Sequence, residues 1–505
     1  MPYLIQKLRN LQQDVPLFSG IRRGIEREGL RVTAAGLPAT TPHPKALGSK
    51  LTHPYITTDY SENLLELITP PCTKVDALLD GMKNTHQFVA EQLQDEWIWP
   101  QSLPCPLVGE IPIANYGTTP AARLKMRYRE GLGLRYGREM QTIAGLHYNF
   151  SFPKSFWETW YTHMDPAHDT LQSCIDTQYF RMIRQHMRHV WILAYLFGAS
   201  MAIDKSLLQD KTAPYLVPFG KTGMIAPYGC SLRLTPLGYY SAVQNELLHV
   251  RCDSLAEYMA DLKAGMQLPY PPYQQLAEIY GDQAQLNTNL LQIEAEFYHP
   301  IRPKRTPMPG ESALDSLAAH GVEYLEVRAI DINPLEPTGF SRQQLLFLDV
   351  YLLFCLSKPS PLFTDHKDWL NTLHKVASIG RTPGLAIMFE GQQQPLKTAL
   401  LTCFDQFVEI ARLLDAEQSD GRYQAAVAHF HEAVLDPSKL LSAQYHQHLE
   451  KVGDMAEAGM VLARQHKEAL LSTPLPPGKT LHFQEVAKNS LEEQHKLEQD
   501  SSVQP

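Results

Sequence analysis

The sequence predicts an α+β protein in which strands and long helices alternate over the first two-thirds of the chain and helices form the rest. Segments of alternating or β-rich character are separated by long segments with helical periodicity. No internal repeat interrupts this order, and from about Asp365 onward the pattern is almost wholly helical. Because long helices lie between the strands, hairpins are not expected to be the dominant connection.

The individual elements follow from local patterns along the chain. Residues 1–14 are predicted as a short amphipathic helix, since they lack the apolar stretch and cleavage site of a signal peptide. Strands are predicted at 22–32, 63–69, 141–152, 290–298 and 322–332. The clearest helices are predicted at 74–94, 121–136, 170–197, 254–266, 311–320 and 343–356.

Two nearly uncharged runs bear on membrane association. The longer run is 190–203, and the second, 345–356, carries Asp349 in its middle. Crossing a bilayer takes about 20 apolar residues. The first run is therefore predicted to be a buried core helix, and the protein is expected to be cytoplasmic with no membrane partner.

Composition narrows the class of protein. The chain has 505 residues, of which 44% are hydrophobic and 20% are charged, and its formal net charge is -9. These values are typical of a globular protein and argue against a nucleic-acid-binding one. The seven cysteines are scattered and form no CxxC pair, which argues against a disulfide framework or a zinc site.

Acidic residues recur two apart, or with a histidine, in the predicted strands. Side chains two apart on a strand share a face. This places Glu26 with Glu28, and it pairs further residues in three other segments: Glu62 with Glu66, His147 with Asn149, and Glu326 with Arg328. Two like charges on one face repel each other unless a cation lies between them.

Adjacent strands that direct acids to one side would line a cavity rich in oxygen ligands, which Mg²⁺ prefers. The alternative for any single acid is an ordinary solvent-facing or salt-bridged residue, and that is the more frequent case. Four separate segments favour the metal site. Alternation alone does not show that the four faces converge.

The sequence gives a weaker signal for nucleotide binding. Gly220-Lys221-Thr222 and Gly478-Lys479-Thr480 both lack the upstream glycine of a phosphate-binding loop. A basic cluster is the remaining candidate, although short basic clusters are more often solvated surface; its members are Arg302, Lys304 and Arg305.

Taken together, a series of short motifs resembles the bacterial glutamate–cysteine ligases. The resemblance begins with Arg23-Gly24-Ile25-Glu26-Arg27-Glu28, Thr57-Thr58-Asp59-Tyr60-Ser61-Glu62 and Ile68-Thr69-Pro70. It continues through Tyr128-Arg129-Glu130-Gly131-Leu132, Gln141 to Phe150, Tyr195 to Ser200, Ser231 to Leu234, Ile301 to Arg305 and Glu323 to Arg328. It covers residues from about 20 to about 360.

The resemblance implies a fold like that of glutamine synthetase, with a curved, mainly antiparallel sheet that forms a funnel backed by helices. It implies one catalytic unit, 1–475, with a sheet-containing core at about 20–360 and a helical part at about 361–475. Residues 472–479 contain three prolines and a glycine, and 485–505 are polar and charged. We therefore expect residues 476–505 to be a weakly ordered polar tail.

The resemblance also implies the reaction and its residues. ATP would phosphorylate the γ-carboxylate of glutamate, and the amine of cysteine would attack to give γ-glutamylcysteine, the first step of glutathione biosynthesis. Mg²⁺, with Mn²⁺ as a substitute, would be held by Glu26, Glu28, Asp59, Glu66, His147 and Glu326. Arg328 and Glu326 would be catalytic. The substrate-binding residues would be Tyr60, Tyr128, Arg129, Leu132, Gln141, Arg233, Tyr239 and Tyr298, with Arg302, Lys304 and Arg305 for the nucleotide.

Two other functions stay open at this point. One is a carboxylate–amine ligase that makes the same acyl phosphate but accepts a different amine, since the acids do not distinguish the two. The other is a non-catalytic protein that keeps the fold and senses glutamate, nucleotide or a thiol; retention of every candidate metal ligand argues against it. The expected form is a monomer.

Overall fold

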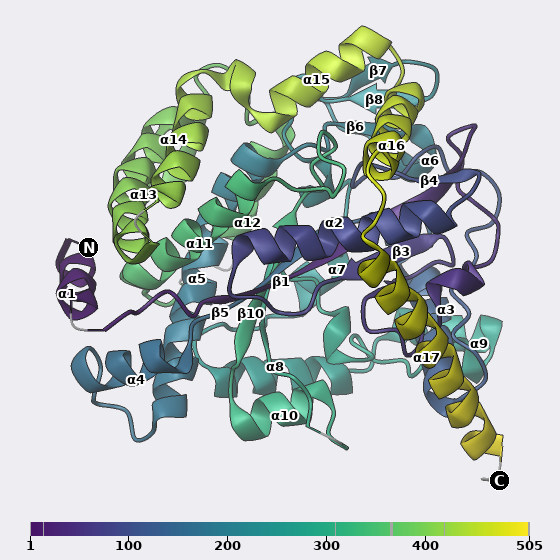
Figure 1. Cartoon of the computed structure of the whole chain (residues 1–505), viewed down its shortest axis with the longest axis horizontal. Helices are drawn as coiled ribbons and strands as arrows, with labels where there is room; N and C mark the ends of the chain where they lie inside the picture. Colours follow the sequence, from purple (N-terminus) through teal and green to yellow (C-terminus); the bar gives the residue numbers. More distant parts are fainter. Residues whose placement is uncertain (1, 14, 309, 364–366, 419, 503–505) are drawn as a thin grey trace.

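The computed structural model describes residues 2–13, 15–308, 310–363, 367–418 and 420–502, and a seven-stranded sheet runs through its centre (Figure 1). All neighbouring strands are antiparallel. Their order is β2 (Ile56–Thr58), β3 (Leu64–Ile68), β1 (Arg22–Thr33), β5 (Leu146–Ser151), β10 (Tyr324–Ile330) and β9 (Ile301–Lys304), and β4 (Glu96–Ile98) pairs with the end of β1. The predicted α+β class with a mainly antiparallel sheet is confirmed.

Four of the five predicted strands are present, as β1, β3, β5 and β10. The prediction for 141–152 is correct only from Leu146, because Met140–Thr142 form a 3-10 turn. The predicted strand at 290–298 is wrong. Its buried Glu296 is bonded to Tyr136 Oη at 2.7 Å and lies 2.9 Å from Arg135 Nη2, which holds the segment as a loop with a short turn, Glu294–Glu296.

The strand in this region is instead β9, which follows the loop. Pro303 lies within it, and a proline argues against a strand in the middle of a sheet. Since β9 is the last strand in the sheet order, the missing N–H of Pro303 interrupts no ladder on the outer side.

Helices surround the sheet, and all the clear helix predictions are confirmed within a few residues at each end. The N-terminal helix and those of the first two-thirds are α1 (Pro2–Gln12), α2 (Val75–Gln92), α3 (Pro120–Tyr136), α4 (Lys154–His163), α5 (Leu171–Phe197), α6 (Lys205–Leu208), α7 (Ala242–Leu247), α8 (Leu255–Gln267), α9 (Pro271–Tyr280), α10 (Ala313–His320) and α11 (Arg342–Ser357). The later helices are α12 (Asp368–Ile379), α13 (Leu396–Gln418), α14 (Arg422–Leu435), α15 (Leu441–Val452), α16 (Met455–Leu471) and α17 (Pro477–Ser502).

Two smaller sheets complete the fold. The hairpin of β11 (Ala386–Phe389) and β12 (Gln392–Pro395) interrupts the C-terminal helices. The other sheet has the order β6 (Ala202–Asp204), β8 (Gly223–Ile225) and β7 (Val217–Phe219). The predicted core helix at 190–203 is therefore only partly correct: the buried end of α5 stops at Phe197, and the chain then enters β6. A Cβ on Gly198 would lie 2.3 Å from the carbonyl oxygen of Ala194, so the close approach at this corner requires glycine.

The expectation of a weakly ordered tail at 476–505 is wrong over 477–502, which form α17. Phe483 and Ala487, four residues apart on this helix, are buried, and the ring of Phe483 stacks on Phe88 of α2 at 5.0 Å. Ser49 N donates to Ser490 Oγ, and Gln494 Nε2 donates to the carbonyl of Tyr116. A narrow apolar stripe on a mostly polar helix is thus enough to dock it, and Figure 1 shows α17 lying along one side of the molecule.

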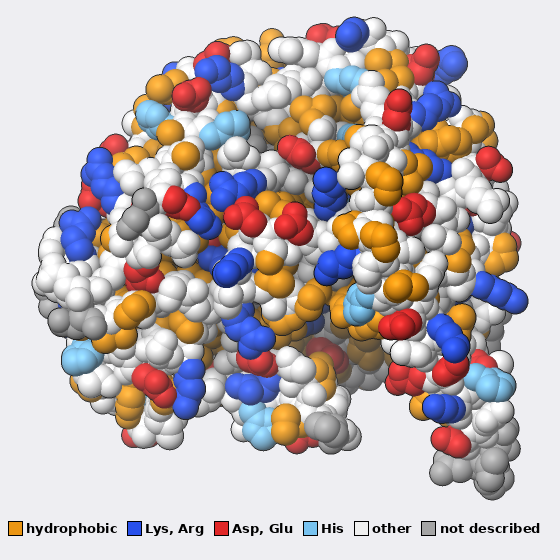
Figure 2. Space-filling view, viewed as in Figure 1, with side chains coloured by type: hydrophobic (Ala, Val, Ile, Leu, Met, Phe, Trp, Pro, Cys, Tyr) orange, Lys and Arg blue, Asp and Glu red, His pale blue; other side chains and the backbone are white. Residues whose placement is uncertain are grey.

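The two faces of the central sheet differ in character. Side chains on one face are apolar and belong to the main core, including Ile25, Leu67, Phe150 and Val327. Helices α2, α5 and α11 also contribute to this core. The opposite face is polar. On the outer surface seen in Figure 2, acidic and basic side chains are interspersed over the helices. Within the described parts of the chain, no helix combines the length and the apolar character needed to cross a bilayer.

A buried ion pair joins the apolar face to the helices behind it. Arg23 on β1 is bonded to Asp349 on α11 through Nε, at 2.9 and 3.0 Å, and through Nη2, at 2.6 Å. Tyr148 on β5 and Tyr423 on α14 donate their hydroxyls to the same carboxylate at 2.7 and 3.0 Å. Asp349, the one charged residue in the apolar run 345–356, therefore connects β1, β5, α11 and α14.

Replacement of Asp349 by alanine should lower the free energy of unfolding by about 3–5 kcal/mol, because it leaves Arg23 charged and unpaired in the core. Urea unfolding followed by circular dichroism measures this change. Glu409→Ala is the control: Glu409 pairs with Arg9 at 3.0 Å, but both side chains are about 40% exposed. Its loss should cost about 1 kcal/mol or less. Equal effects of the two substitutions would contradict the anchoring role of Asp349.

Candidate functional site

The register of the central sheet brings the acids predicted by alternation onto one face. Glu28 lies opposite Glu66, and Glu26 lies opposite His147. Glu326 lies opposite Asn149 on the next strand. Directly paired residues of an antiparallel sheet point to the same side. The polar face of β3, β1, β5 and β10 therefore carries one continuous set of carboxylates with a histidine among them.

Three of these side chains are close enough to share one ion. His147 Nδ1 lies 3.1 Å from Glu26 Oε2 and 3.7 Å from Glu326 Oε1, and one ligand atom from each residue lies within 4.8 Å of the other two. The other ring nitrogen of His147, Nε2, lies 3.7 Å from Glu28 Oε1. The imidazole thus stands at the centre of three carboxylates contributed by two strands.

Glu66 and Asp59 extend the acidic set. Burial, together with the charges of Glu26, Asp59 and Glu28, raises the pKa of Glu66 well above its usual range. Burial also raises the pKa of Glu28, and Asp59 adds to this effect, although His147 and nearby arginines oppose it. Asp59 follows β2, and its carbonyl accepts from Arg129 Nε at 2.5 Å and from Tyr116 Oη at 2.8 Å. Arg129 therefore positions the turn that carries Asp59.

Donors on the same face stabilise part of this charge. Arg328 Nη1 donates to Glu326 Oε1 at 3.1 Å, and Lys304 Nζ lies 3.7 Å from Glu326 Oε2. Burial alone would raise the pKa of Glu326, but these two cations hold it below its usual value. In the same way, hydrogen bonds with His147 and Asn149 outweigh burial and lower the pKa of Glu26.

The residues present fit a hard divalent cation. Glu326 Oε2 is buried and has no hydrogen-bond partner among the described residues. Burial and the like charges of Glu26, Asp59 and Glu28 raise the pKa of Glu66, and a cation among these acids would oppose both effects. Carboxylate oxygens with a single imidazole suit Mg²⁺ or Mn²⁺, and the set contains no thiolate.

The residues implied for the substrate form two aromatic clusters beside the acids. Tyr60 and Leu132 are buried together with Tyr128 packed against them. Gln141 Nε2 donates to Tyr298 Oη at 3.2 Å, and the Tyr239 ring centroid lies 4.6 Å from that of Tyr298. The two clusters share Tyr136, which the sequence did not indicate. Tyr60 Oη is buried without a partner among the described residues, and burial raises the pKa of this hydroxyl to about 12.

Arg233 lies between the aromatic clusters and the polar face. Its Nη2 donates to the carbonyl of Arg328 at 3.1 Å, and its Nη1 lies 4.0 Å from Asp331 Oδ1. Nε and Nη1 are buried without a hydrogen-bond partner in the described structure. A Cβ on Gly145 would approach Arg233 Nη2 to 2.3 Å, so a larger residue there would displace the guanidinium from its place beside the start of β5. Arg233 can therefore offer donors to an anionic group.

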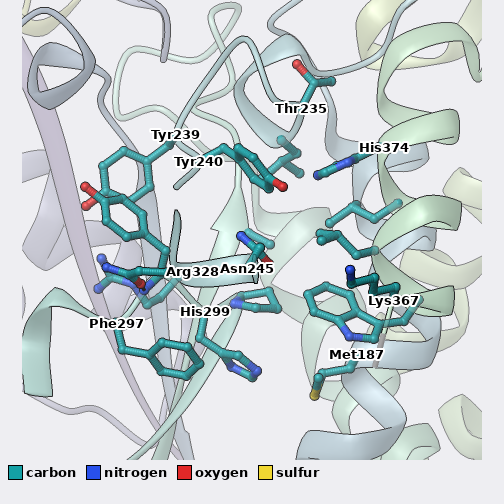
Figure 3. A pocket seen from close by; sticks show the side chains of 18 of the residues that line it. Met187, Thr235, Tyr239, Tyr240, Asn245, Phe297, His299, Arg328, Lys367 and His374 are labelled. Carbon is teal, nitrogen blue, oxygen red and sulfur yellow. Dashed lines mark hydrogen bonds between the residues drawn. The ribbon is translucent and has the colours of Figure 1, made fainter. Parts of the chain in front are cut away.

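A cavity opens from these residues toward α12. Arg233, Tyr239, Tyr298 and Arg328 line one side of it, and Trp369 and His374 line another. Figure 3 shows Tyr239 and Arg328 facing Lys367 and His374 across this space. The sequence did not indicate that α12 lines this cavity, because α12 and the sheet meet through residues that are far apart in the chain.

The structure brings two of the three basic residues predicted for the nucleotide to the polar face. Lys304 reaches this face beside Glu326. Arg302 also lies on this face, opposite Glu326, but its Nη2 is bonded to the carbonyls of Ala295 and Phe297. Arg305 is not brought to the acids, since its guanidinium is bonded to the carbonyl of Gly321 and to Gln172.

Glu62 likewise does not join the set, although alternation placed it on one face with Glu66. It precedes β3, and its carboxylate is bonded to Lys50 Nζ at 2.5 Å and to the backbone N–H groups of His43 and Asn115. Two further residues support the site: Asn149 donates to Glu26 Oε1 at 2.8 Å, and Gly145 N donates to Glu28 Oε2 at 2.6 Å. Alternation on β5 indicated Asn149.

Comparison with known proteins gives consistent matches over most of the chain. A family model described as glutamate-cysteine ligase matches residues 5–376. A glutamate–cysteine ligase from Shewanella amazonensis is 42% identical over 94% of this chain and 91% of its own length. One from Pseudomonas paraeruginosa is 41% identical over 96% of this chain and 93% of its own length.

Solved structures agree with the observed fold. The crystal structure of a glutamate–cysteine ligase from Francisella tularensis in complex with AMP matches with a TM-score of 0.87 and 33% identity, covering 95% of this chain and 94% of the other. A bifunctional glutathione synthetase from Pasteurella multocida has the same fold over 96% of this chain and 57% of its own, with a TM-score of 0.74 and 24% identity.

Replacement of Glu66 by glutamine should stabilise the protein in EDTA at neutral pH. Because the pKa of Glu66 is raised on folding, the wild-type chain loses stability as pH rises above the usual value of 4.5, and glutamine does not titrate. We expect a gain of about 1–2 kcal/mol in urea unfolding at pH 7.5, since a tenfold change in an acid dissociation constant corresponds to about 1.4 kcal/mol. The gain should vanish below pH 4.

Glu62→Gln is the matched control on the same segment. Bonds from Lys50 and two backbone N–H groups outweigh burial and lower the pKa of Glu62, so its loss should destabilise the protein at neutral pH. Saturating Mg²⁺ should remove the advantage of Glu66→Gln by stabilising the wild-type chain more than the variant. A Glu66→Gln protein less stable than wild type in EDTA would contradict the repulsion.

Proposed function

This chain belongs to the glutamate–cysteine ligase family, and we infer that it joins the γ-carboxylate of glutamate to the amino group of cysteine at the expense of ATP. The observation that carries this inference is the convergence of Glu26, His147 and Glu326, with Glu28 and Glu66 beside them, on one face of the central sheet. A monomeric state and a cytoplasmic location remain predictions from the sequence.

We propose that Glu26, Glu28, Asp59, Glu66, His147 and Glu326 hold Mg²⁺, with Mn²⁺ as a substitute. A divalent cation bound there would offset charge on the transferring phosphoryl group and align ATP with glutamate. The protein keeps its own ligands in place through Asn149 and Gly145 at Glu26 and Glu28, and through Arg129 at the turn of Asp59.

Arg328 is proposed to stabilise the phosphoryl group as it moves from ATP to the γ-carboxylate of glutamate. Its guanidinium bonds to Glu326 through Nη1 and lines the cavity, where it can meet a bound phosphoryl group. A planar guanidinium matches the paired oxygens of a phosphoryl group. Transfer gives a γ-glutamyl phosphate and ADP; attack by the cysteine amine then forms the amide and releases phosphate. Lys304 supports this step through its proximity to Glu326.

The two aromatic clusters are proposed to receive cysteine. Tyr60, Tyr128 and Leu132 would surround the thiol side, while Gln141, Tyr239 and Tyr298 offer polar groups for the backbone of the amino acid. The unpartnered donors of Arg233 suit a substrate carboxylate. The hydroxyl of Tyr60, which lacks a partner among the described residues, is the group best placed to discriminate among acceptors.

Release of ADP by the purified chain tests this function. With ATP, Mg²⁺ and glutamate, we expect cysteine to accelerate ADP release, and mass spectrometry should show γ-glutamylcysteine in equal amount. Faster turnover with an amine other than cysteine would identify a different ligase. Absence of ADP release with every amine would identify a binding protein.

Arg328→Lys should keep the charge yet lower turnover by about 10²-fold and leave the affinity for glutamate nearly unchanged. Lysine lacks the planar fork, and the loss of one preorganised donor typically costs 10² to 10³ in rate. Single-turnover formation of the acyl phosphate, trapped as the hydroxamate, is the measurement. A normal rate in the folded variant would mean that Arg328 serves only as the partner of Glu326.

A further inference from the structure

The connection between α4 and α5 gathers a second group of metal-binding side chains, separate from the polar face of the sheet. His168 Nε2 lies 3.1 Å from Asp165 Oδ2, and one ligand atom each of Asp165, His168 and Cys174 lies within 4.8 Å of the other two. The connection is at the edge of the molecule in Figure 1, beside the label α4. The cluster combines carboxylate, imidazole and thiol, so its chemistry differs from that of the acid-rich site.

Local structure explains how the three residues meet. Helix α4 ends at His163, and α5 begins after Thr170, which forms a capping box with Ser173. Cys174 therefore lies in the first turn of α5 with its side chain buried. Asp165 and His168 come from the short connection, and Tyr161 Oη fixes this connection by donating to the carbonyl of His168 at 2.9 Å.

A second layer of hydrogen bonds orients the carboxylate. Gln178, one helical turn after Cys174 and fully buried, donates through Nε2 to Asp165 Oδ2 at 2.9 Å. Arg181 donates in turn to Gln178 Oε1 at 2.9 Å. Outer groups of this kind are typical of built metal sites, where they hold the ligands in position.

We propose that Asp165, His168 and Cys174 form a zinc site, with water as the fourth ligand, that fastens the connection between α4 and α5. All three side chains are zinc ligands, and two ligands at about 2.0 Å from a tetrahedral ion lie about 3.3 Å apart. The distance of 3.1 Å between His168 and Asp165 fits this geometry. The side chains of Asp165 and His168 are 32% and 22% exposed, so an ion can enter from solvent.

A metal ion at this site would hold α4 in place and, through it, the end of β5. Trp157 and Trp160 on α4 are buried, and the ring of Trp157 lies 5.3 Å from that of Phe152, one residue beyond β5. Strand β5 carries His147 and Asn149. Because the ligand is the thiolate of Cys174, binding would release its proton. No sequence motif indicated this site, because a single cysteine forms no CxxC pair.

Cobalt binding to the EDTA-treated, full-length chain tests the proposal. Co²⁺ takes the place of zinc and gives a thiolate-to-metal charge-transfer band in the near ultraviolet. We expect a band that saturates at one Co²⁺ per chain and disappears when one equivalent of Zn²⁺ is added. The acid-rich site contains no thiolate, so Co²⁺ bound there gives no such band.

Variants assign the band to its ligands. Cys174→Ser should abolish it, and His168→Gln and Asp165→Asn, at partly exposed positions, should weaken Co²⁺ binding at least tenfold. Cys252→Ser is the matched control, since Cys252 is also buried and its Sγ lies 3.9 Å from His299 Nε2; this variant should keep the band.

Zn²⁺ should also raise the melting temperature of the wild-type chain and not that of Cys174→Ser. Circular dichroism and ligation with Mg²⁺ check that each variant is folded. The proposal is overturned if the wild-type chain shows no band, if the band survives in Cys174→Ser, or if His168→Gln and Asp165→Asn bind Co²⁺ as tightly as wild type.

Discussion

Repulsion between carboxylates on one face of an antiparallel sheet is the constraint on which the site depends. The register of β1 with β3 and β5 leaves Glu26, Glu28 and Glu66 no other direction in which to point. Their charges, with those of Asp59 and Glu326, face one another on a partly buried surface, and burial together with these charges raises the pKa of Glu66. Arg328 and Lys304 hold the pKa of Glu326 below its usual value. A divalent cation on this face would relieve the repulsion, which is the physical reason for the metal site we propose.

The opposite face of the same strands has to supply the stability that this repulsion removes. Because side chains alternate along a strand, each acid is flanked by residues directed into the main core, such as Ile25 and Val327. Arg23, Asp349, Tyr148 and Tyr423 add a buried network whose donors and acceptors satisfy one another. Besides their own bonds to Asn149, Gly145 and Arg328, the acids therefore depend on the packing of the opposite face.

Sequence reasoning succeeded where the controlling interaction is local. Alternation with a period of two located Glu26, Glu28, Glu66, His147 and Glu326, because parity along a strand needs no tertiary information. It misplaced Glu62, whose partners Lys50 and Asn115 lie in other segments. Asp59 lies in the turn after β2, where alternation does not apply, and only the family resemblance indicated it.

The errors in the predicted fold also arise where partners distant in the sequence decide the structure. The segment 290–298 has the pattern of a strand, but the bonds of Glu296 to Arg135 and Tyr136 hold it as a loop. The polar composition of α17 hid the contact of Phe483 with Phe88. Arg302 and Arg305 are only three residues apart in the sequence. Arg302 nevertheless lies on the face of the acids, whereas Arg305 is bonded to the carbonyl of Gly321. Residue type and spacing define what a side chain can bind, whereas long-range partners decide which of those bonds it makes. The two proposed metal sites differ for this reason in the donors that converge. Carboxylate oxygens surround His147, whereas the set at Cys174 adds a sulfur to one nitrogen and one oxygen, so ligand softness would favour different ions at each.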